Sequence, residues 1–181
     1  MSIGWMCYLI HYKNLFIEVV AMNIVRFTKM HGAGNDFILI DDRDDKFPIH
    51  DHRRIAAMAT RRIGIGCEGV IVLQKSSKYD FKMLFFNPDG TEADLCGNGA
   101  RCIAAFAKEI GAVNKNTMCF ETAAGLIEAE VLNDNYVKIV MPKPKDFSDD
   151  YVVVGVPHKI VLVENLAGVD VEKIGREIRM S

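Results

Sequence analysis

The sequence has no strong excess of charge of either sign, and it contains few prolines. Its 22 Lys and Arg residues nearly balance 24 Asp and Glu residues, which gives a formal net charge of -2. This balance argues against a broad nucleic-acid-binding surface. Hydrophobic residues make up 50% of the 181 residues and proline only 5 of them, so a disordered or collagen-like chain is excluded. The composition is typical of a chain with an ordinary hydrophobic core.

Paired cysteine motifs are also missing. The five cysteines are odd in number, and no two of them form a Cys-x-x-Cys pair. A zinc finger and a disulfide framework are therefore poor interpretations, and no metal site is expected. We expect a reducing compartment, the cytoplasm.

Long hydrophobic runs are absent as well. The apolar residues 3–10 are followed by His11 and Lys13, whereas a membrane-spanning helix needs about 20 mostly apolar residues. The segment also lacks the basic start and small-residue cleavage site of a secretory signal, so no membrane association is expected. We interpret residues 1–21 as an upstream extension to a domain that starts at Met22. A real amphipathic arm that packs on the surface is the alternative.

Hydrophobic patterning indicates the class of fold. Apolar and alternating runs predict short strands at residues 24–30, 37–41, 70–73, 81–86, 117–121, 126–132, 136–141, 151–154 and 160–163. Helices are predicted at residues 51–62, 97–110 and 170–179. The helix at 97–110 is apolar over most of its circumference, so we expect it to be buried. Short hairpin strands around one buried helix favour an α+β fold with a mainly antiparallel sheet.

A domain boundary is predicted where this pattern breaks. Residues 142–146 read Pro-Lys-Pro-Lys-Asp and separate two groups of strands. We therefore expect an amino-terminal domain at residues 22–142 and the start of a second domain at residues 143–181.

Cys96 is the leading candidate for chemistry. It stands immediately before Gly97-Asn98-Gly99, at the expected start of the buried helix. The first amides of a helix have no partner within the helix and carry partial positive charge, which favours a thiolate and can hold a substrate carboxylate. A base beside a bound carboxylate is what proton abstraction at the alpha carbon requires. The alternative is that Cys96 is a small buried hydrophobic residue, as most free cysteines are.

Three further residues stand in conspicuous turns. Asn35 follows His31-Gly-Ala-Gly, and Asn87 opens the turn Asn-Pro-Asp-Gly. Both asparagines have an equally good structural role, because turns use Gly and Asn for backbone reasons. His158, which follows Gly-Val-Pro between two predicted strands, is more often a structural hydrogen-bonding residue than a catalyst.

The other cysteines and the arginine cluster receive structural interpretations. Cys102 lies about 240° around the helix from Cys96 and is predicted to belong to the core, as is Cys119 within its strand. Cys67, in a glycine-rich loop, stays unassigned. The arginines at 53, 54, 61 and 62 are predicted to form a solvated helix face.

Distinctive segments follow one another along the chain at residues 29–37 (Lys-Met-His-Gly-Ala-Gly-Asn-Asp-Phe), 64–69 (Gly-Ile-Gly-Cys-Glu-Gly) and 87–101 (Asn-Pro-Asp-Gly…Asp-Leu-Cys-Gly-Asn-Gly-Ala-Arg). In spacing and order they resemble the amino-terminal half of the diaminopimelate epimerase family. Residues 121–125 and 155–158 fall where that family has related segments, so the resemblance runs from about Met22 to Ser181.

The resemblance implies an isomerase of lysine and peptidoglycan-precursor synthesis that interconverts LL- and meso-diaminopimelate without a cofactor. It implies two similar domains, each a sheet curled around a central helix, with the substrate in the cleft between them. Each domain would supply one cysteine. One thiolate removes the alpha proton, and the other cysteine, as a thiol, delivers a proton to the opposite face. The implied partner is the small amino-acid substrate, and the resemblance suggests a homodimer.

The resemblance also assigns roles to individual residues. By matching position, Cys96 is one of the two catalytic cysteines. The backbone amides of Gly97 and Asn98 would bind the reacting carboxylate. Asn35 and Asn87 match substrate-contacting asparagines, and His158 matches a histidine close to the site that we count with the catalytic candidates.

Two features depart from the family pattern. Many members have a substrate-binding asparagine where this chain has Val156, which cannot form that hydrogen bond through its side chain. No second Cys-Gly-Asn-Gly or Cys-Gly-Ser-Gly motif is present among the 181 residues. We therefore expect the second domain to be truncated and this chain to be inactive or weakly active alone, because inversion needs a proton donor on the opposite face.

Three other functions remain open. A noncatalytic half-domain could keep the carboxylate-binding helix start without the chemistry. A proline or hydroxyproline racemase-like enzyme shares the two-cysteine logic, although those proteins typically carry Cys-Gly-His-Gly. A thiol redox protein is disfavoured because no resolving cysteine is placed near Cys96 in the sequence.

Overall fold

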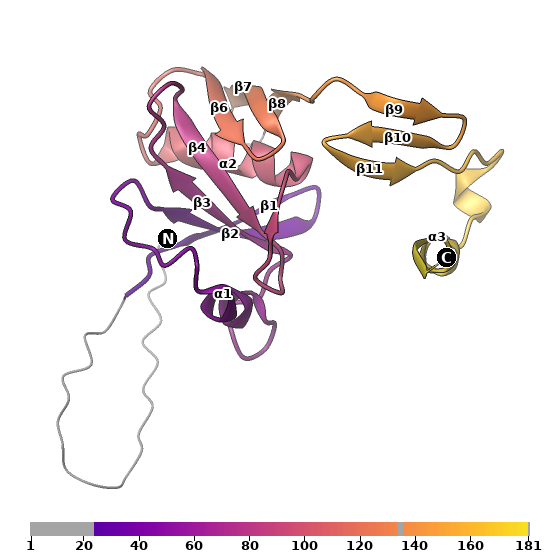
Figure 1. Ribbon diagram of the computed structural model, residues 1–181, viewed down its shortest axis with the longest axis horizontal. Helices are drawn as coiled ribbons and strands as arrows, with labels where there is room; N and C mark the ends of the chain where they lie inside the picture. Colours follow the sequence, from indigo (N-terminus) through magenta and orange to yellow (C-terminus); the bar gives the residue numbers. More distant parts are fainter. Residues whose placement is uncertain (1–23, 134–135, 181) are drawn as a thin grey trace, which may run out of the picture. The chain divides into compact units, whose positions relative to one another are not determined.

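The computed structural model describes residues 24–133 and 136–180, and the predicted extension at 1–21 lies outside the described residues (Figure 1). The chain divides into two compact units, Met1–Pro142 and Lys143–Ser181. Each unit is described by itself below.

The first unit is built on one mixed sheet. Its strands are β1 (Thr28–Gly32), β2 (Asn35–Asp41), β3 (Gly69–Gln74), β4 (Phe81–Phe86), β5 (Glu92–Ala93), β6 (Thr117–Thr122), β7 (Gly125–Asn133) and β8 (Tyr136–Val140). They pair in the order β1-β2-β3-β4-β6-β7-β8, and the short strand β5 pairs with β4.

Most neighbouring strands are antiparallel, but two pairs are parallel. β2 and β3 run in the same direction, with Phe37 opposite Gly69, and so do β4 and β6, with Phe81 opposite Phe120. A helix lies in each of these connections, α1 (His52–Ala59) in the first and α2 (Gly97–Glu109) in the second. A crossover of this kind returns the chain in its original direction. The predicted α+β class holds, and the sheet is mainly antiparallel, as predicted, with two parallel pairs.

The helix α2 packs against strands from both ends of the sheet. It contacts β1, β2 and β3 at one end and β7 and β8 at the other. The buried residues of α2 are Gly99, Ala100, Cys102, Ile103, Ala104, Phe106 and Ala107. Gly99 allows a close approach, because a Cβ at this position would lie 2.9 Å from Ile71 Cδ1 of β3.

A second apolar layer covers the other face of the central strands. There α1 contributes Ile55 and Ala59 to a buried cluster that includes Ile38, Val70 and Leu84. The strands β2, β3 and β4 are therefore buried on both faces, which explains why their sequences are nearly continuous hydrophobic runs.

Two element boundaries differ from the sequence prediction by three residues or more. The helix expected at 51–62 ends at Ala59, because Thr60 adopts an extended backbone (ψ 122°) and Arg62 has a positive φ of 75°. The strand expected at 24–30 begins only at Thr28.

The second unit holds a small antiparallel sheet followed by a helix. Its elements are β9 (Lys145–Ser148), β10 (Tyr151–Val154), β11 (Val156–Lys159), the 3-10 helix η1 (Leu166–Gly168) and α3 (Val171–Met180), and the strand order is β11-β10-β9. The strand predicted at 160–163 is wrong, because the paired strand is β11. Gly155, with φ 73°, turns the chain so tightly that Val156 already pairs with Val154. Among the described residues, no helix has the length and apolar character needed to cross a membrane.

Candidate active site

Cys96 is the N-cap residue of α2. Its backbone is extended (φ -129°, ψ 118°), and its carbonyl oxygen accepts a hydrogen bond from the Ala100 N–H at 2.7 Å. The Cys96 side chain forms no capping hydrogen bond with this helix start. The backbone amides of Gly97 and Asn98 occupy the first helical positions, where N–H groups have no partner within a helix and carry partial positive charge. The half-buried thiol therefore stands beside a ready-made anion-binding position.

Asn35 brings a side-chain amide to the same point. It is the first residue of β2, and its Nδ2 donates a hydrogen bond to Cys96 Sγ at 3.9 Å. Its Oδ1 is buried and has no hydrogen-bond partner in the described part of the chain. A buried amide oxygen normally has a partner. The pair therefore presents one N–H donor to the sulfur and one open acceptor beside it.

A tight hairpin carries Asn35 to the helix. Ala33 and Gly34 both have positive φ, 54° and 84°, and together form the two-residue turn between β1 and β2. Gly32 pairs with Asn35 across this turn, and a Cβ on Gly32 would lie 3.0 Å from the Asn98 carbonyl oxygen. The hairpin backbone therefore rests directly on the first turn of α2. This explains why the segment before Asn35 is rich in glycine.

The side chain of Asn98 is held within its own helix. Its Oδ1 accepts a short hydrogen bond from the Arg101 guanidinium. This leaves the Asn98 backbone N–H, rather than its side chain, as the group oriented for an anion at the helix start.

Asp36, the residue after Asn35, is the centre of an ion cluster that the sequence analysis missed. Its carboxylate contacts Arg61 (Oδ1 to Nη2, 2.6 Å) and Lys29 (Oδ2 to Nζ, 2.7 Å), and Arg61 also contacts Glu68 Oε1 at 2.9 Å. The hydrogen bond from Arg61, together with Lys29, holds the pKa of Asp36 well below its usual range. Arg61 is therefore an ion-pairing residue beyond the end of α1, not part of a solvated helix face. The signal available in the sequence was that Lys29, Asp36 and Glu68 all lie within the distinctive segments.

Asn87 is not brought to Cys96 by any contact among the described residues. Its Nδ2 donates to Thr91 Oγ1 at 3.1 Å, and its backbone N–H donates to the Thr91 carbonyl at 2.8 Å. These bonds close the turn between β4 and β5. The geometry of Asn87 is thus accounted for by the turn, and its role toward a substrate stays a prediction.

His158 and Val156 lie in the second unit. Both belong to β11, where His158 is exposed and pairs in register with Val152. The contacts described above around Cys96 are made by residues of the first unit, and the assignment of His158 stays a prediction.

The remaining described cysteines lie in environments unlike that of Cys96. Burial raises the pKa of Cys102 to about 11 and also raises the pKa of Cys67. Cys119 is only half-buried, which corrects its prediction as a core residue, although burial and the neighbouring Glu128 and Asp80 raise the pKa of its thiol.

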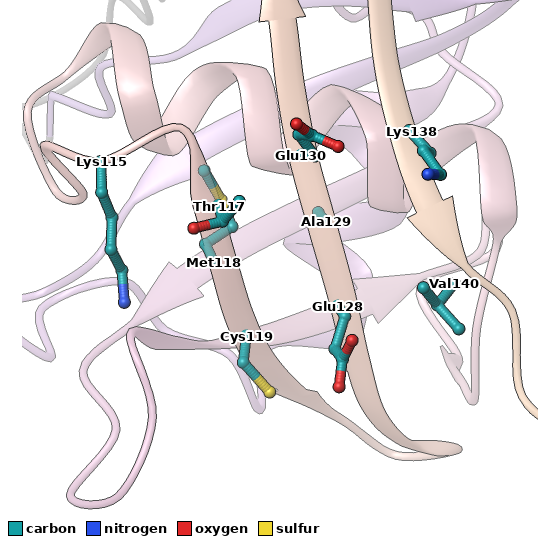
Figure 2. Close-up of a pocket in the computed structure, with 9 residues that line it drawn as sticks. All are labelled: Lys115, Thr117, Met118, Cys119, Glu128, Ala129, Glu130, Lys138 and Val140. Atoms are coloured by element: carbon teal, nitrogen blue, oxygen red, sulfur yellow. The ribbon is translucent and has the colours of Figure 1, made fainter.

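A shallow pocket of about 380 Å³ lies on the outer face of β6, β7 and β8 (Figure 2). Its lining residues are Lys115, Thr117, Met118, Cys119, Glu128, Ala129, Glu130, Lys138 and Val140. Among them, Met118 and Ala129 are buried toward the core that contains α2, whereas Glu128 and Lys138 are exposed. The pocket therefore opens on the face of the sheet that points away from α2, and Cys96 is not among its lining residues. In the described ranges, no group of three or more His, Cys, Asp or Glu side chains is placed to hold a metal ion.

Sequence comparisons place this geometry in a known family. The family model described as diaminopimelate epimerase matches residues 27–145. The diaminopimelate epimerase of Flavobacterium psychrophilum is 37% identical over 161 residues, covering 87% of this chain and 62% of that protein. The diaminopimelate epimerase of Chlorobaculum tepidum is 42% identical over 161 residues, covering 83% of this chain and 62% of that protein. This chain spans 62% to 65% of the length of the curated relatives that it matches.

Solved structures share the fold at low sequence identity. A probable proline racemase from Agrobacterium radiobacter K84 matches with a TM-score of 0.55 and 16% identity, over 84% of this chain and 53% of that chain. A hydroxyproline epimerase from Agrobacterium vitis matches with a TM-score of 0.52 and 17% identity, over 82% of this chain and 52% of that chain. The range matched by the family model contains Asn35, Asn87 and Cys96, and the chain belongs to the diaminopimelate epimerase family.

Proposed function

We propose that this chain supplies one catalytic cysteine, Cys96, to a cofactor-independent epimerase that interconverts LL- and meso-diaminopimelate. The reaction would serve lysine and peptidoglycan-precursor synthesis in the cytoplasm. Family membership supports the substrate and the type of reaction. The observation that carries the proposal is the position of Cys96 as N-cap of α2, with the Asn35 amide against its sulfur.

The geometry supports a specific division of labour. The carboxylate next to the reacting carbon binds the backbone amides of Gly97 and Asn98, where the helix start stabilises negative charge. The Cys96 thiolate takes the alpha proton and becomes a thiol, while the electron pair left on carbon is delocalised into the bound carboxylate. The open Oδ1 of Asn35 accepts a hydrogen bond from an N–H group of the substrate. Asn87 and His158 are proposed to lie near the substrate through the family resemblance alone.

One thiol acts on one face of the alpha carbon. Inversion needs a second acid on the opposite face, and no other cysteine in the described ranges stands before a helix: Cys67 precedes β3, Cys102 lies within α2, and Cys119 lies within β6. We therefore propose that the polypeptide of 181 residues exchanges the alpha hydrogen with solvent but produces little or no meso product.

Proton NMR of LL-diaminopimelate in deuterated buffer tests this proposal. The expected result is loss of the alpha-proton signal without appearance of the meso isomer, because the protonated thiol exchanges with solvent and returns a deuteron to the same face. Cys96→Ala should abolish the exchange. Cys102→Ala is the matched control, since it removes a buried thiol from the same helix and should leave the exchange in place.

Each other result points to a different function. Exchange that persists in Cys96→Ala, or no exchange with the unaltered chain, contradicts the proposal. Meso product that depends on Cys96 would mean that a second acid is present. Binding of diaminopimelate in calorimetry without exchange would favour a noncatalytic carboxylate-binding domain. Exchange at proline but not at diaminopimelate would favour a racemase-like enzyme.

A further inference from the structure

Asp36 binds the start of β2 to three separate segments of the chain. Arg61 follows α1, Lys29 belongs to β1, and Glu68 precedes β3. The Arg61 guanidinium binds both carboxylate oxygens, with Nη2 2.6 Å from Oδ1 and Nη1 3.1 Å from Oδ2. Lys29 Nζ lies 2.7 Å from Oδ2 and also donates a short hydrogen bond to the Gly66 carbonyl. These side chains, Lys29, Asp36, Arg61 and Glu68, are called the Asp36 cluster below.

The backbone of Asp36 is held at the same point. The Glu68 N–H donates to the Asp36 carbonyl at 2.8 Å and lies 3.2 Å from Asp36 Oδ1. The Asp36 side chain is only 20% exposed, so its ion pairs are less screened than pairs at an open surface, which contribute little. Side chain and backbone together fix Asp36 against the loop before β3.

The next residue back, Asn35, makes the contact with the thiol. Its Nδ2 lies 3.9 Å from Cys96 Sγ, and its hairpin partner Gly32 touches the Asn98 backbone. The hairpin end is therefore held between the Asp36 cluster on one side and the first turn of α2 on the other. A small shift of this end would take the Asn35 amide away from the sulfur, because the two atoms already lie 3.9 Å apart.

We propose that Asp36 is a positioning residue that acts through Asn35 on Cys96. The Asp36 cluster holds the start of β2 so that the Asn35 amide donates to the Cys96 sulfur and stabilises it in the thiolate form. This inference deepens the proposed function and rests on it for the use of Cys96 as a base. The reactivity of the thiol can be measured without any substrate.

The test is the rate at which iodoacetamide alkylates Cys96 at pH 7, followed by peptide mass spectrometry. Thiolate is the reacting species, so a misplaced Asn35 amide slows the reaction, by about threefold or more in Asp36→Asn and Arg61→Gln. Arg61→Lys, which keeps a cation, should retain more of the rate than Arg61→Gln. If Asp36→Asn does not fold, Arg61→Gln decides the question, since the Arg61 side chain is 56% exposed.

Asp41→Asn is the matched control. Asp41 lies at the other end of β2 and forms an ion pair with Arg43 in which both carboxylate oxygens take part, at 2.8 and 2.6 Å. Removing this pair should leave the alkylation rate of Cys96 unchanged.

A purely structural role for Asp36 predicts that its replacement speeds the alkylation of Cys96 instead of slowing it. Loosening of the hairpin would expose Cys96, speed its alkylation and make the buried Cys67 and Cys102 reactive. Faster or unchanged alkylation of Cys96 in folded Asp36→Asn and Arg61→Gln would overturn the inference. No diaminopimelate is present in this experiment. A negative exchange result therefore refutes the proposed function, and a negative alkylation result refutes the positioning role of Asp36.

Discussion

Asp36 also links the stability of the first unit to pH. The Arg61 guanidinium and the Lys29 ammonium hold its folded-state pKa below the value of about 3.9 that an unfolded aspartate has. Folding therefore favours the ionised carboxylate. The resulting stabilisation is fully present above the unfolded pKa and is lost as the pH falls from about 4 toward the lower folded-state value.

The variant Asp36→Asn should reveal this dependence. At pH 7 we expect its free energy of unfolding to be lower than that of the unaltered chain by about 1–2 kcal/mol, because a charge-assisted network is lost. The difference should shrink as the pH falls below about 4, because the unfolded chain takes up a proton at Asp36 there while the folded carboxylate is still ionised. Urea unfolding at several pH values measures it. A difference that stays constant with pH would contradict the assignment of the effect to ionisation.

Residues differ in how far the sequence predicts their roles. Local motifs single out Cys96 and Asn35 separately, and the structure places their side chains 3.9 Å apart. The role of Arg61 could not be predicted in this way. It depends on where α1 ends and on the positive φ of Arg62, which together direct Arg61 toward Asp36. Long-range ion pairs of this kind are set by tertiary geometry and leave no local periodicity.

At the scale of elements, hydrophobic runs predict strands better than they predict strand partners. The runs at β3 and β4 were assigned correctly as strands. The parallel pairing of β2 with β3, however, is decided by the crossover through α1, which local patterning does not encode. The strand predicted at 160–163 fails for a related reason. Its apolar residues are exposed, whereas β11 is set by the tight turn at Gly155.

The turn between β4 and β5 gives a sharper prediction at this scale. Gly90 has a φ of 85° and is buried, and a Cβ there would collide with the backbone of His52, whose ring donates to the Gly90 carbonyl at 2.8 Å. Gly90→Ala should therefore destabilise the first unit by about 3 kcal/mol or more, since backbone strain and a backbone clash add. Urea unfolding measures the loss.

Gly34→Ala is the matched control for Gly90→Ala. Gly34 has nearly the same φ, 84°, but a Cβ there would meet no atom within 4 Å. Its cost should be confined to the strain of the left-handed backbone, about 1–2 kcal/mol. Equal losses in the two variants would show that the contact between α1 and the turn does not limit substitution at Gly90.

At the scale of the whole molecule, the two units differ in what they bury. The first unit has fully buried large side chains on both faces of its sheet, among them Phe37, Phe81 and Ile55. In the described residues of the second unit, 143–180, no residue is fully buried. Several large apolar residues are exposed there, including Phe147 and Leu162 at 72% and 88%. A segment with few buried apolar contacts opens at a low free-energy cost.

Among the described residues, limited proteolysis with chymotrypsin should therefore begin in the second unit. Cleavage after Phe147 or Leu162 is expected first, because a protease needs a locally opened chain and little burial opposes opening there. Tyr136 is an internal comparison, because it is 66% exposed but lies in a sheet that packs on the buried core of the first unit. Side-chain exposure alone predicts early cleavage there, and local opening predicts late cleavage. A time course of intact-mass spectra separates the two. Cleavage after Tyr136 as early as after Phe147, or cleavage in the core of the first unit at the same rate, would contradict the difference in local stability.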